Sequence, residues 1–497
     1  MKKKLVTWLL LLAMVVSTLA GCGKNENPDG EGSAAGDGDH LTFSMAVAQY
    51  SDAAYAEDSV FGQFCKNSNI SFDIEVLDDS STQRPLLMNT GTYPDVMFAT
   101  YMWDKTEIIS YVKQGCLLPL EDLIKEHAPN LTAVLDEYDL WETLTIDGHI
   151  YDIPTVYLPS TNGNQYFYIN EQWLENVGMD MPTNPDELYA VLKAFKEQDA
   201  NGNGDPNDEI PFSCNTGVKL SMSFPWFFDQ FVLNNWIAIN ENDEVYLCAY
   251  SEAYKEFLAF WTKCYEEGLM EVDCFTQERD AMTAAGQAEY IYGSYLGFSA
   301  DEACPEGMGI NYTILPAFTE SGYPVATSLY RGCLVLGDTC ENPERVISWV
   351  DQFYTEEGAL ACYLGIEGTD YNVVDGKYET VNSEESKKLG LDNFPTKELT
   401  EYYLNGTNEL SSKIFAAKQE MVANGWKVPT FVLNSEQTES AGTYLNDFWS
   451  YWNTYNAEVI TGVKDLDDTW DTYLADMKRM GAEEYAAIFQ EVCDAMK

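Results

Sequence analysis

Short apolar runs alternate with amphipathic segments from Leu41 to Gly115, and this alternation constrains the fold more than any other feature of the chain. In chain order the segments are LTFSMAV, FGQFC, SFDIEVL, QRPLLMNTG, PDVMFAT and KTEIISYVKQG. The first, third and fifth have the length and composition of strands, and the others have the pattern of helices. Such an order is typical of an α/β lobe with a largely parallel sheet. Ligands bind at the carboxyl ends of strands in these sheets, so the loop after PDVMFAT is a candidate binding loop.

A second unit begins near Gln165 and contains a helix with well-marked ends. Asn184 has the residue type of an N-cap, Pro185 suits the first turn, and Glu187 would close a capping box. One face of this helix is apolar and consists of Leu188, Val191, Leu192 and Phe195. The sequence therefore predicts an amphipathic helix that buries this face.

The loop after this helix begins like a calcium-binding loop. Oxygen-bearing side chains occupy its first, third and fifth positions and glycine the sixth, in the residues Asp199, Asn201, Asn203 and Gly204. Calcium takes about six to eight oxygen ligands, and a tight glycine turn lets alternate side chains point at one centre. The pattern departs from an EF-hand at its end, where the twelfth residue is Ile210 and the acid is Glu209. The alternative is an Asn, Gly and Asp turn that binds nothing.

The rest of the chain mixes strands and helices and shows no internal repeat. The pattern predicts a helical pair over residues 251–268 and 278–288. Strand-like segments follow in AEYIYGSYLGFS, in residues 312–315 and in SLYRGCLVL. Residues 343–364 and most of the remainder are typical of helices.

The first residues indicate export from the cell. Met1 to Lys4 include three lysines, residues 5–16 are uncharged and largely apolar, and Leu-Ala-Gly-Cys ends at Cys22. The apolar run is shorter than the roughly 20 residues of a transmembrane helix. The LAGC motif resembles the lipobox of bacterial lipoproteins, which implies cleavage before Cys22 and acylation of this cysteine. The alternative is an ordinary secretory signal with an incidental cysteine.

A stretch rich in Gly, Asp, Asn and Ser follows Cys22 and indicates a flexible tether. We therefore expect residues 1–21 to be a lipoprotein signal peptide and residues 22–40 to be the lipidated cysteine with its tether. The remaining chain should lie at the extracellular face of the bacterial cell membrane, lipid-anchored through Cys22.

The charge balance excludes most nucleic-acid roles. The chain has 81 acidic and 28 basic side chains, which give a formal net charge of -53. Proteins that hold phosphate backbones gather lysine and arginine, and no segment after the first few residues is basic. We expect neutral or cationic partners and no nucleic acid.

The cysteines favour buried thiols over disulfides or a metal framework. Eleven of the 12 cysteines follow Cys22, and they show neither CxxC pairs nor histidine neighbours at zinc spacing. Cys116, Cys333 and Cys362 lie in apolar runs, where cysteine usually acts as a small hydrophobe.

The sequence singles out no catalytic centre. It contains no GxSxG elbow, no HExxH motif and no phosphate-binding glycine-rich loop, and its 3 histidines stand apart from one another. A glycosidase needs two carboxylates at a set separation, and a pair of this kind remains open among so many acids. A surface adhesin would show repeats and strand-rich patterning that this chain lacks.

Several motifs in fixed order carry a family resemblance. They are MNTGTYPDVMFA, YVKQGCLLPLEDLIKEHAPNL, DGHIYDIPTV, YINEQWLENVGMDMPTNPDELYAVLKAFKEQDANGNGDPNDEIPFS, YEEGLMEVDCF and YLGIEGTDYNVVDGKYE. The chain resembles the extracellular solute-binding lipoproteins of ABC importers, in the branch with alginate-oligosaccharide and maltose binders. The resemblance implies an α/β, two-lobe periplasmic-binding-protein-like fold of type II, with a hinge and an interlobe ligand cleft.

This resemblance also implies a function and a domain division. It implies a monomer that is not an enzyme, and that captures a carbohydrate, expected to be a neutral oligosaccharide, for delivery to an ABC permease. A peptide or other non-sugar ligand and an anchored glycosidase stay as alternatives. The implied lobes are residues 41–158 with 322–364, and residues 159–321 with 365–497.

Family ligand contacts, carried onto matching positions, imply a set of binding residues. They are Tyr101, Trp103, Asp104, Trp226, Trp236, Tyr295, Tyr330 and Arg331. A sugar ring presents apolar C–H faces rimmed by hydroxyls, so flat aromatic side chains cover it while carboxylates, amides and arginine bond the hydroxyls. The alternatives are that Trp226 and Trp236 belong to a core and that Arg331 forms a structural ion pair.

The family's calcium loop also maps onto this chain. The implied ligands of a structural Ca²⁺ are Asp199, Asn201, Asn203, Asp205, Asp208 and Glu209. Many members lack the extra residue that this chain has before Asp208, so Asn207 stays an alternative ligand.

Overall fold

The structure is a computed structural model. It describes residues 39–48, 51–99, 103, 105–161, 165–217, 220, 231–232, 236–240, 242–319, 322–327, 329–381, 386–389, 394–400, 406, 408–427 and 431–495. The predicted signal peptide, Cys22 and almost all of the tether lie outside these residues. Within them, no helix has the length and apolar character needed to cross a membrane.

A five-stranded sheet is formed by the first part of the chain together with one later strand. Its order is β2 (Ile70–Val76), β1 (Leu41–Val47), β3 (Val96–Phe98), β13 (Leu329–Leu336) and β4 (Asp152–Val156). β1 pairs in parallel with β2 and β3, and β13 runs antiparallel to β3 and β4. Four strands therefore share one direction, which confirms the predicted largely parallel sheet.

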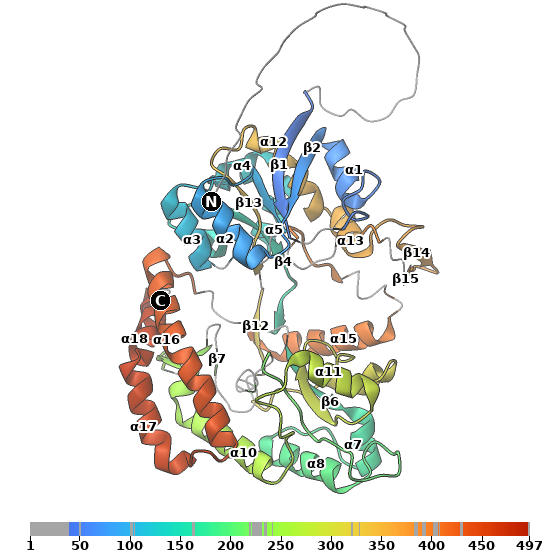
Figure 1. The fold of residues 1–497 in the computed structure, drawn as a ribbon, viewed down its shortest axis with the longest axis vertical. Coiled ribbons are helices and arrows are strands. Elements are labelled where there is room, and N and C mark those ends of the chain that lie inside the picture. Colours follow the sequence, from blue (N-terminus) through green and yellow to red (C-terminus); the bar gives the residue numbers. More distant parts are fainter. Residues whose placement is uncertain are drawn as a thin grey trace, which may run out of the picture. The chain divides into compact units, whose positions relative to one another are not determined.

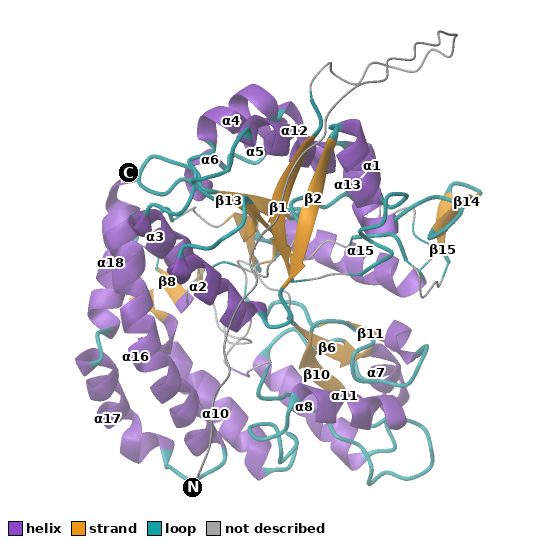
Figure 2. Cartoon of the chain, turned by 45° about the horizontal axis from the view of Figure 1, so that its top comes forward, coloured by secondary structure: helices purple, strands orange, loops and turns teal. Residues whose placement is uncertain are grey.

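Helices cover both faces of this first sheet, as Figure 2 shows. They are α1 (Val60–Asn67), α2 (Ser80–Thr90), α3 (Lys105–Gln114), α4 (Glu121–His127), α5 (Pro129–Glu137), α6 (Trp141–Leu144), α12 (Pro343–Asp351) and α13 (Glu356–Leu364). Alternate residues of β1 enter opposite cores: Met45 packs in the core that holds Trp349, and Ala46 packs in the core that holds Ile108. This alternation is what a strand buried on both faces requires.

A second sheet is formed by β10 (Ser294–Gly297), β6 (Tyr166–Asn170) and β11 (Tyr312–Ile314), in that order. Around it lie α7 (Glu171–Val177), α8 (Pro185–Glu197), α10 (Glu252–Glu266) and α11 (Arg279–Ala288). Short strands β7 (Phe231–Val232), β8 (Ile237–Ile239) and β9 (Val245–Leu247) form another sheet. The predicted helical pair and the predicted strands at residues 312–315 and in SLYRGCLVL are confirmed.

Helix α8 matches its sequence prediction closely. Asn184 is the N-cap and accepts a hydrogen bond from the Glu187 amide, and the predicted apolar face is buried. The Glu187 side chain reaches one residue further back than predicted, since its carboxylate accepts bonds from the amide and hydroxyl of Thr183. These bonds lower the pKa of Glu187.

The C-terminal part is mostly helical, as predicted. It comprises α15 (Glu409–Asn424), α16 (Ser435–Ile460), α17 (Leu466–Arg479) and α18 (Ala482–Ala495), preceded by a hairpin of β14 (Tyr371–Val374) and β15 (Lys377–Thr380). Trp452 of α16 is fully buried in the core that also holds Phe167 of the second sheet. Figure 1 shows α16 and α17 beside α10, and α18 packs against α16 and α17.

Two segments that connect the two sheets, β5 (Ser160–Thr161) and β12 (Pro324–Ala326), lie side by side, and a third short strand joins them in one sheet. The chain leaves β4 and enters β6 through β5, which pairs with β12 on the return path. β12 also pairs with β16 (Trp426–Lys427). We call β5, β12 and β16 the crossing sheet. Next to it Val156 exchanges backbone hydrogen bonds with Thr396 and Glu398.

Candidate functional site

The carboxyl ends of β1, β3 and β4 meet the first residues of β13 at one edge of the first sheet. The Ala48 amide bonds to the Ala99 carbonyl at 3.3 Å, and the Trp103 amide bonds to the Arg331 carbonyl at 3.4 Å. The structure thus brings together the loop after PDVMFAT and the start of SLYRGCLVL, as the family pattern implies. Tyr101 and Asp104 belong to this loop but lie outside the described residues.

The Trp103 side chain lies in the core rather than on the surface, with 1 % of its area exposed. The Arg84 guanidinium carbon is 5.1 Å from the indole centroid, and Tyr111 packs edge-on at 5.6 Å. Gly332, at φ 68°, makes room for the indole, because a Cβ atom there would lie 2.4 Å from the Trp103 Cβ. The role of Trp103 as a ligand contact stays a prediction.

Arg331 and Asp152 form a buried ion pair. Asp152 is fully buried, and its Oδ1 and Oδ2 accept bonds from Arg331 at 2.5 and 3.2 Å. The guanidinium also donates to the carbonyls of Thr143 and Leu144, while the Gly332 amide donates to Asp152 at 2.8 Å. Most N–H donors of Arg331 therefore bond to other groups of the protein. This arrangement favours the alternative stated for Arg331, a structural ion pair.

Two half-buried tyrosines lie at the same edge. Tyr330 packs edge-on against Tyr157 with ring centroids 5.1 Å apart. Leu158, which follows Tyr157 in the chain, donates its backbone amide to the Glu398 carboxylate at 2.9 Å. Tyr330 is a predicted ligand residue. Tyr157 and Glu398 are not among the predicted residues, although Tyr157 directly follows the predicted strand in DGHIYDIPTV.

Polar contacts join this part of the first sheet to the start of α16. The Lys105 ammonium donates to the Leu433 carbonyl at 2.7 Å, and the Ser435 hydroxyl donates to Asp147 at 2.5 Å. Burial, with the nearby charge of Arg331, lowers the pKa of Lys105 to about 8, against the opposite effect of Asp147 and Asp152. Sequence offers no signal for these contacts, because the partners are hundreds of residues apart.

The predicted residues of the second sheet lie deeper. Tyr295 is fully buried, and its hydroxyl donates to the Ser299 carbonyl at 3.1 Å. Trp236 is half-buried against Trp449 and Trp452, with ring centroids 5.7 and 5.3 Å away. Trp226 lies outside the described residues. Tyr295 and Trp236 as ligand contacts stay predictions.

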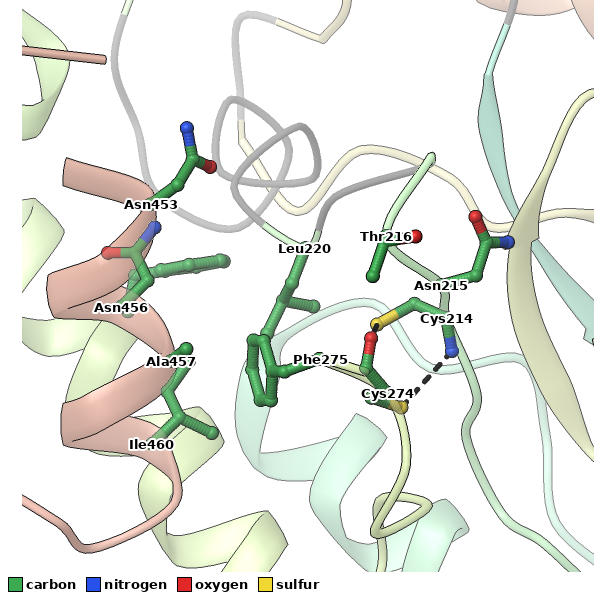
Figure 3. A pocket seen from close by; sticks show the side chains of 11 residues that line it. Cys214, Asn215, Thr216, Leu220, Cys274, Phe275, Asn453, Asn456, Ala457 and Ile460 are labelled. Carbon is green, nitrogen blue, oxygen red and sulfur yellow. Dashed lines mark hydrogen bonds between the residues drawn. The ribbon is translucent and has the colours of Figure 1, made fainter. Parts of the chain in front are cut away.

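A cavity of about 120 Å³ lies between α10, α16 and the segments around Cys214 and Cys274 (Figure 3). The Cys214 amide donates to the Cys274 sulfur at 3.2 Å, and the Tyr254 hydroxyl donates a hydrogen bond to Oδ1 of Asn456 at 2.5 Å. The cavity is smaller than the roughly 300–1,000 Å³ of most ligand pockets. Its polar side chains make it suitable for ordered water.

The eleven cysteines after Cys22 are all buried thiols, as predicted. Burial raises the pKa of Cys65, Cys264 and Cys362 to about 12. Thiolates are the reactive form of cysteine, so these side chains act as small apolar groups.

The loop at residues 199–209 contains buried carboxylate oxygens without hydrogen-bond partners. They are Oδ1 of Asp199 and both side-chain oxygens of Glu209. Burial, together with the charge of Asp208, raises the pKa of Glu209. Buried polar atoms are nearly always bonded, so these oxygens fit a hard cation that accepts their lone pairs.

Other side chains of the loop hold its shape. The Gly204 amide donates to the second carboxylate oxygen of Asp199 at 3.0 Å, and the side-chain amides of Asn201 and Asn203 donate to Asp208 at 3.1 and 2.6 Å. No cluster of three or more His, Cys, Asp or Glu side chains poised to hold a metal is found in the described parts of the chain. A calcium site here would draw on asparagine and backbone oxygens as well.

No protein-family model matches the chain. The chain is 26 % identical over 493 residues to the fructooligosaccharide ABC transporter substrate-binding protein FusA of Streptococcus pneumoniae, across 91 % of this chain and 90 % of FusA. It is 25 % identical to the lipoprotein LipO of Bacillus subtilis, across 87 % and 86 % of the two chains.

Solved structures resemble this one over most of its length. FusA in complex with kestose superposes with a TM-score of 0.73 at 24 % identity, and covers 92 % of this chain and 99 % of its own. An EF-hand mutant of FusA with fructo-nystose has the same TM-score and coverage at 23 % identity. An HMO-binding solute-binding protein of Bifidobacterium longum infantis reaches 0.75 at 18 % identity, with coverage of 92 % and 99 %.

These similarities confirm the predicted fold class. The chain has the α/β, two-lobe fold of solute-binding proteins. Its homologues include the substrate-binding proteins of sugar ABC transporters.

Proposed function

We propose that this chain is the substrate-binding component of an ABC transporter, which captures a carbohydrate between its two lobes and passes it to a membrane permease. The single observation that carries the proposal is the 26 % identity to a fructooligosaccharide-binding protein across 91 % of this chain. The negative charge, the half-buried aromatic pair at the sheet edge and the absence of a catalytic motif in the sequence support it. A neutral oligosaccharide is the expected ligand.

The crossing sheet is suited to act as the hinge of this mechanism. It consists only of short strands, so small backbone rotations there would turn one sheet against the other. A ligand that contacts both lobes would favour the closed form by its higher affinity for that form, and a permease would recognise closure. The sequence predicts lobes of residues 41–158 with 322–364, and residues 159–321 with 365–497. Leu389 and Phe394 pack in the core of the first sheet. We therefore propose these lobes with the third crossing placed after Phe394, which assigns residues 365–394 to the first lobe.

The proposed ligand contacts are the residues predicted from the family pattern. Tyr330 of this set has an exposed part, and Tyr157 and Glu398 beside it extend the surface with an aromatic ring and a carboxylate. Aromatic faces cover the apolar side of a sugar, and carboxylates accept bonds from its hydroxyls.

At least one neutral trisaccharide should bind with a dissociation constant near 1 µM, which corresponds to roughly 8 kcal/mol. At a concentration of about 100 times this constant, the ligand should stabilise the fold by about 2.7 kcal/mol. Thermal-shift screening of fructan, α-glucan, β-glucan and xylan trisaccharides, followed by calorimetry, measures both quantities. Tetraalanine serves as the control for a peptide ligand.

Mass spectrometry of the ligand after incubation separates binding from catalysis. An intact sugar is expected from a transport protein. Shortened sugars would instead assign the chain to the anchored glycosidases, and affinity for the peptide alone would assign it a non-sugar ligand.

Export and anchoring complete the proposal. The lipobox-like LAGC and the relative called a lipoprotein support acylation of Cys22 and a position at the extracellular face of the membrane. A monomer tethered by residues 22–40 would reach a permease beside it.

We also propose a structural calcium ion in the loop at residues 199–209. The unbonded buried oxygens of Asp199 and Glu209 support it, together with the EF-hand mutant known for FusA. The proposed ligands are Asp199, Asn201, Asn203, Asp205, Asp208 and Glu209. Such an ion would neutralise crowded carboxylates and hold the loop against α8.

Removing calcium should lower the melting temperature by several degrees. Calcium at about 100 times its dissociation constant stabilises a folded protein by about 2.7 kcal/mol, and chelation removes this contribution. Calorimetry in calcium and in EDTA measures the difference.

Asp199→Ala should abolish the calcium dependence, whereas Asp78→Asn, a change at an exposed acid of the first lobe, should leave it intact. Equal melting curves of the wild type in calcium and EDTA would contradict the proposal.

A further inference from the structure

Phe298 is an exposed aromatic residue at the end of a buried strand. It follows Gly297, the last residue of β10, and 38 % of its surface is exposed. It belongs to none of the apolar clusters of the described chain. A single exposed hydrophobic residue needs no explanation by itself, so the side chains around it decide what it can do.

Arg279 and Glu302 fix the position of this ring. The Arg279 guanidinium carbon lies 4.4 Å from the ring centroid, so the cation covers the phenyl group. Glu302, with 3 % of its side chain exposed, accepts a bond from Nε of Arg279 with one oxygen and from the Phe298 amide at 2.6 Å with the other. One buried carboxylate therefore orients both the ring and the cation.

Glycine at position 297 is necessary for this arrangement. A Cβ atom there would lie 2.8 Å from the second oxygen of Glu302 and 2.9 Å from the Tyr295 ring. The backbone thus approaches the buried carboxylate closely at the residue before the exposed ring.

The Arg279 guanidinium keeps unused hydrogen-bond donors. Its side chain is 48 % exposed, and among the described residues only its Nε group donates a bond. The two terminal nitrogens remain available to an incoming oxygen atom. The surface therefore combines an apolar flat ring with adjacent N–H donors.

The position of this surface fits the proposed mechanism. Gly297 pairs with Tyr166, which is the first residue of β6 after the crossing sheet. The end of β10 therefore lies at the edge of the second sheet where the chain enters from the first lobe. A second cation, Lys418 of α15, lies 4.8 Å from the Tyr166 ring at the same edge.

We infer that Phe298 and Arg279 form a sugar-ring subsite of the second lobe, in which the phenyl ring stacks on a C–H face and the guanidinium donates to hydroxyl oxygens. This inference rests on the proposed function. The combination of an exposed ring and unused donors matches the amphipathic surface of a pyranose or furanose ring. Glu302 is a positioning residue that acts through the other two.

The test uses the full mature chain and the trisaccharide of the panel that binds the wild type most tightly. Phe298→Leu keeps an apolar side chain but loses the flat face, and should raise the dissociation constant about tenfold or more, the usual loss for an aromatic anchor. Phe298→Trp keeps a flat face and should retain binding within about threefold. Calorimetry measures binding, and the melting temperature should stay unchanged.

Arg279→Lys tests the guanidinium while it keeps a positive charge beside Glu302. It should raise the dissociation constant about fivefold or more, since a lysine cannot cover the ring and donate at two points. The matched control is Arg479→Lys, at a solvent-exposed arginine that is paired with Asp476 in the same lobe, and it should bind like the wild type.

The outcomes separate this inference from the proposed function. Weaker binding of Phe298→Leu and Arg279→Lys, with Phe298→Trp and Arg479→Lys unchanged, supports the subsite. Wild-type affinity in Phe298→Leu overturns the subsite and leaves the transport function standing. No binding of any panel sugar to the wild type overturns both.

Discussion

Replacing Asp152 by alanine should lower the free energy of unfolding by about 3–5 kcal/mol. The Arg331 guanidinium would lose the carboxylate that accepts two of its bonds, and it has 12 % of its side chain exposed. The Gly332 amide would lose its acceptor as well. A buried charge without a partner costs far more than the pair contributes, because water cannot replace the carboxylate. Urea denaturation of the purified chain measures the loss.

Two further variants identify the cause of the effect. Asp476→Ala removes the partner of Arg479, whose side chain is 73 % exposed, and should cost less than about 1 kcal/mol. The double variant Asp152→Leu with Arg331→Met removes both charges and should be more stable than Asp152→Ala. A loss below about 1 kcal/mol in Asp152→Ala would contradict the importance of the pair.

Replacing Gly332 by alanine should destabilise the fold by about 2–5 kcal/mol. A left-handed backbone costs an ordinary residue about 1–2 kcal/mol, and Gly332 has a φ of 68°. The added methyl group would also lie within 2.4 to 2.7 Å of three atoms of Trp103, and overpacking of this kind costs about 1–3 kcal/mol more. Denaturation in urea measures the sum.

Gly462 provides the matched control, because its φ is 74° and no atom lies within 4 Å of its Cβ position. Gly462→Ala should therefore cost only the backbone contribution, about 1–2 kcal/mol. The difference between the two variants measures the contact with Trp103. If Gly332→Ala and Gly462→Ala lose the same free energy of unfolding, the contact between the added methyl group and Trp103 costs nothing, which would contradict the prediction.

Local signals predict most of the secondary structure correctly. The alternation from Leu41 to Gly115 predicts three strands and three helices, all of which are present, and the N-cap and buried face of α8 are as expected. These features depend on neighbours within a few residues, so the printed sequence contains the necessary information. The Glu187 carboxylate accepts a bond from the Thr183 amide instead of the Asn184 amide, so the predicted capping interaction is shifted by one residue.

Local sequence patterns do not predict contacts between segments that are far apart in the chain. Trp103 follows a predicted strand at a binding edge, yet its ring is buried because Gly332 leaves space for it and Arg84 covers it. A glycine inside the predicted strand SLYRGCLVL was the available signal of a close approach. The partner of Arg331 is Asp152, and nothing in the sequence selects that acid among 81.

The strand period explains why Phe298 was missed. The family pattern implies Tyr295, but on β10 this side chain points into the core shared with Tyr168 and Tyr312. Phe298 comes after the strand has ended, where alternation no longer fixes its direction. Glu302, four residues later in the chain, accepts a hydrogen bond from the Phe298 amide and so fixes the backbone at the exposed ring.

Eleven thiols lie inside the described fold without a cross-link between them. The described fold therefore needs neither an oxidase nor a disulfide isomerase to form. Heating reverses this advantage, because unfolding in air exposes all these thiols together and random cross-links then trap the chain. Purification and refolding should succeed with a reductant throughout, and recovery after a heating cycle should fall when the reductant is omitted.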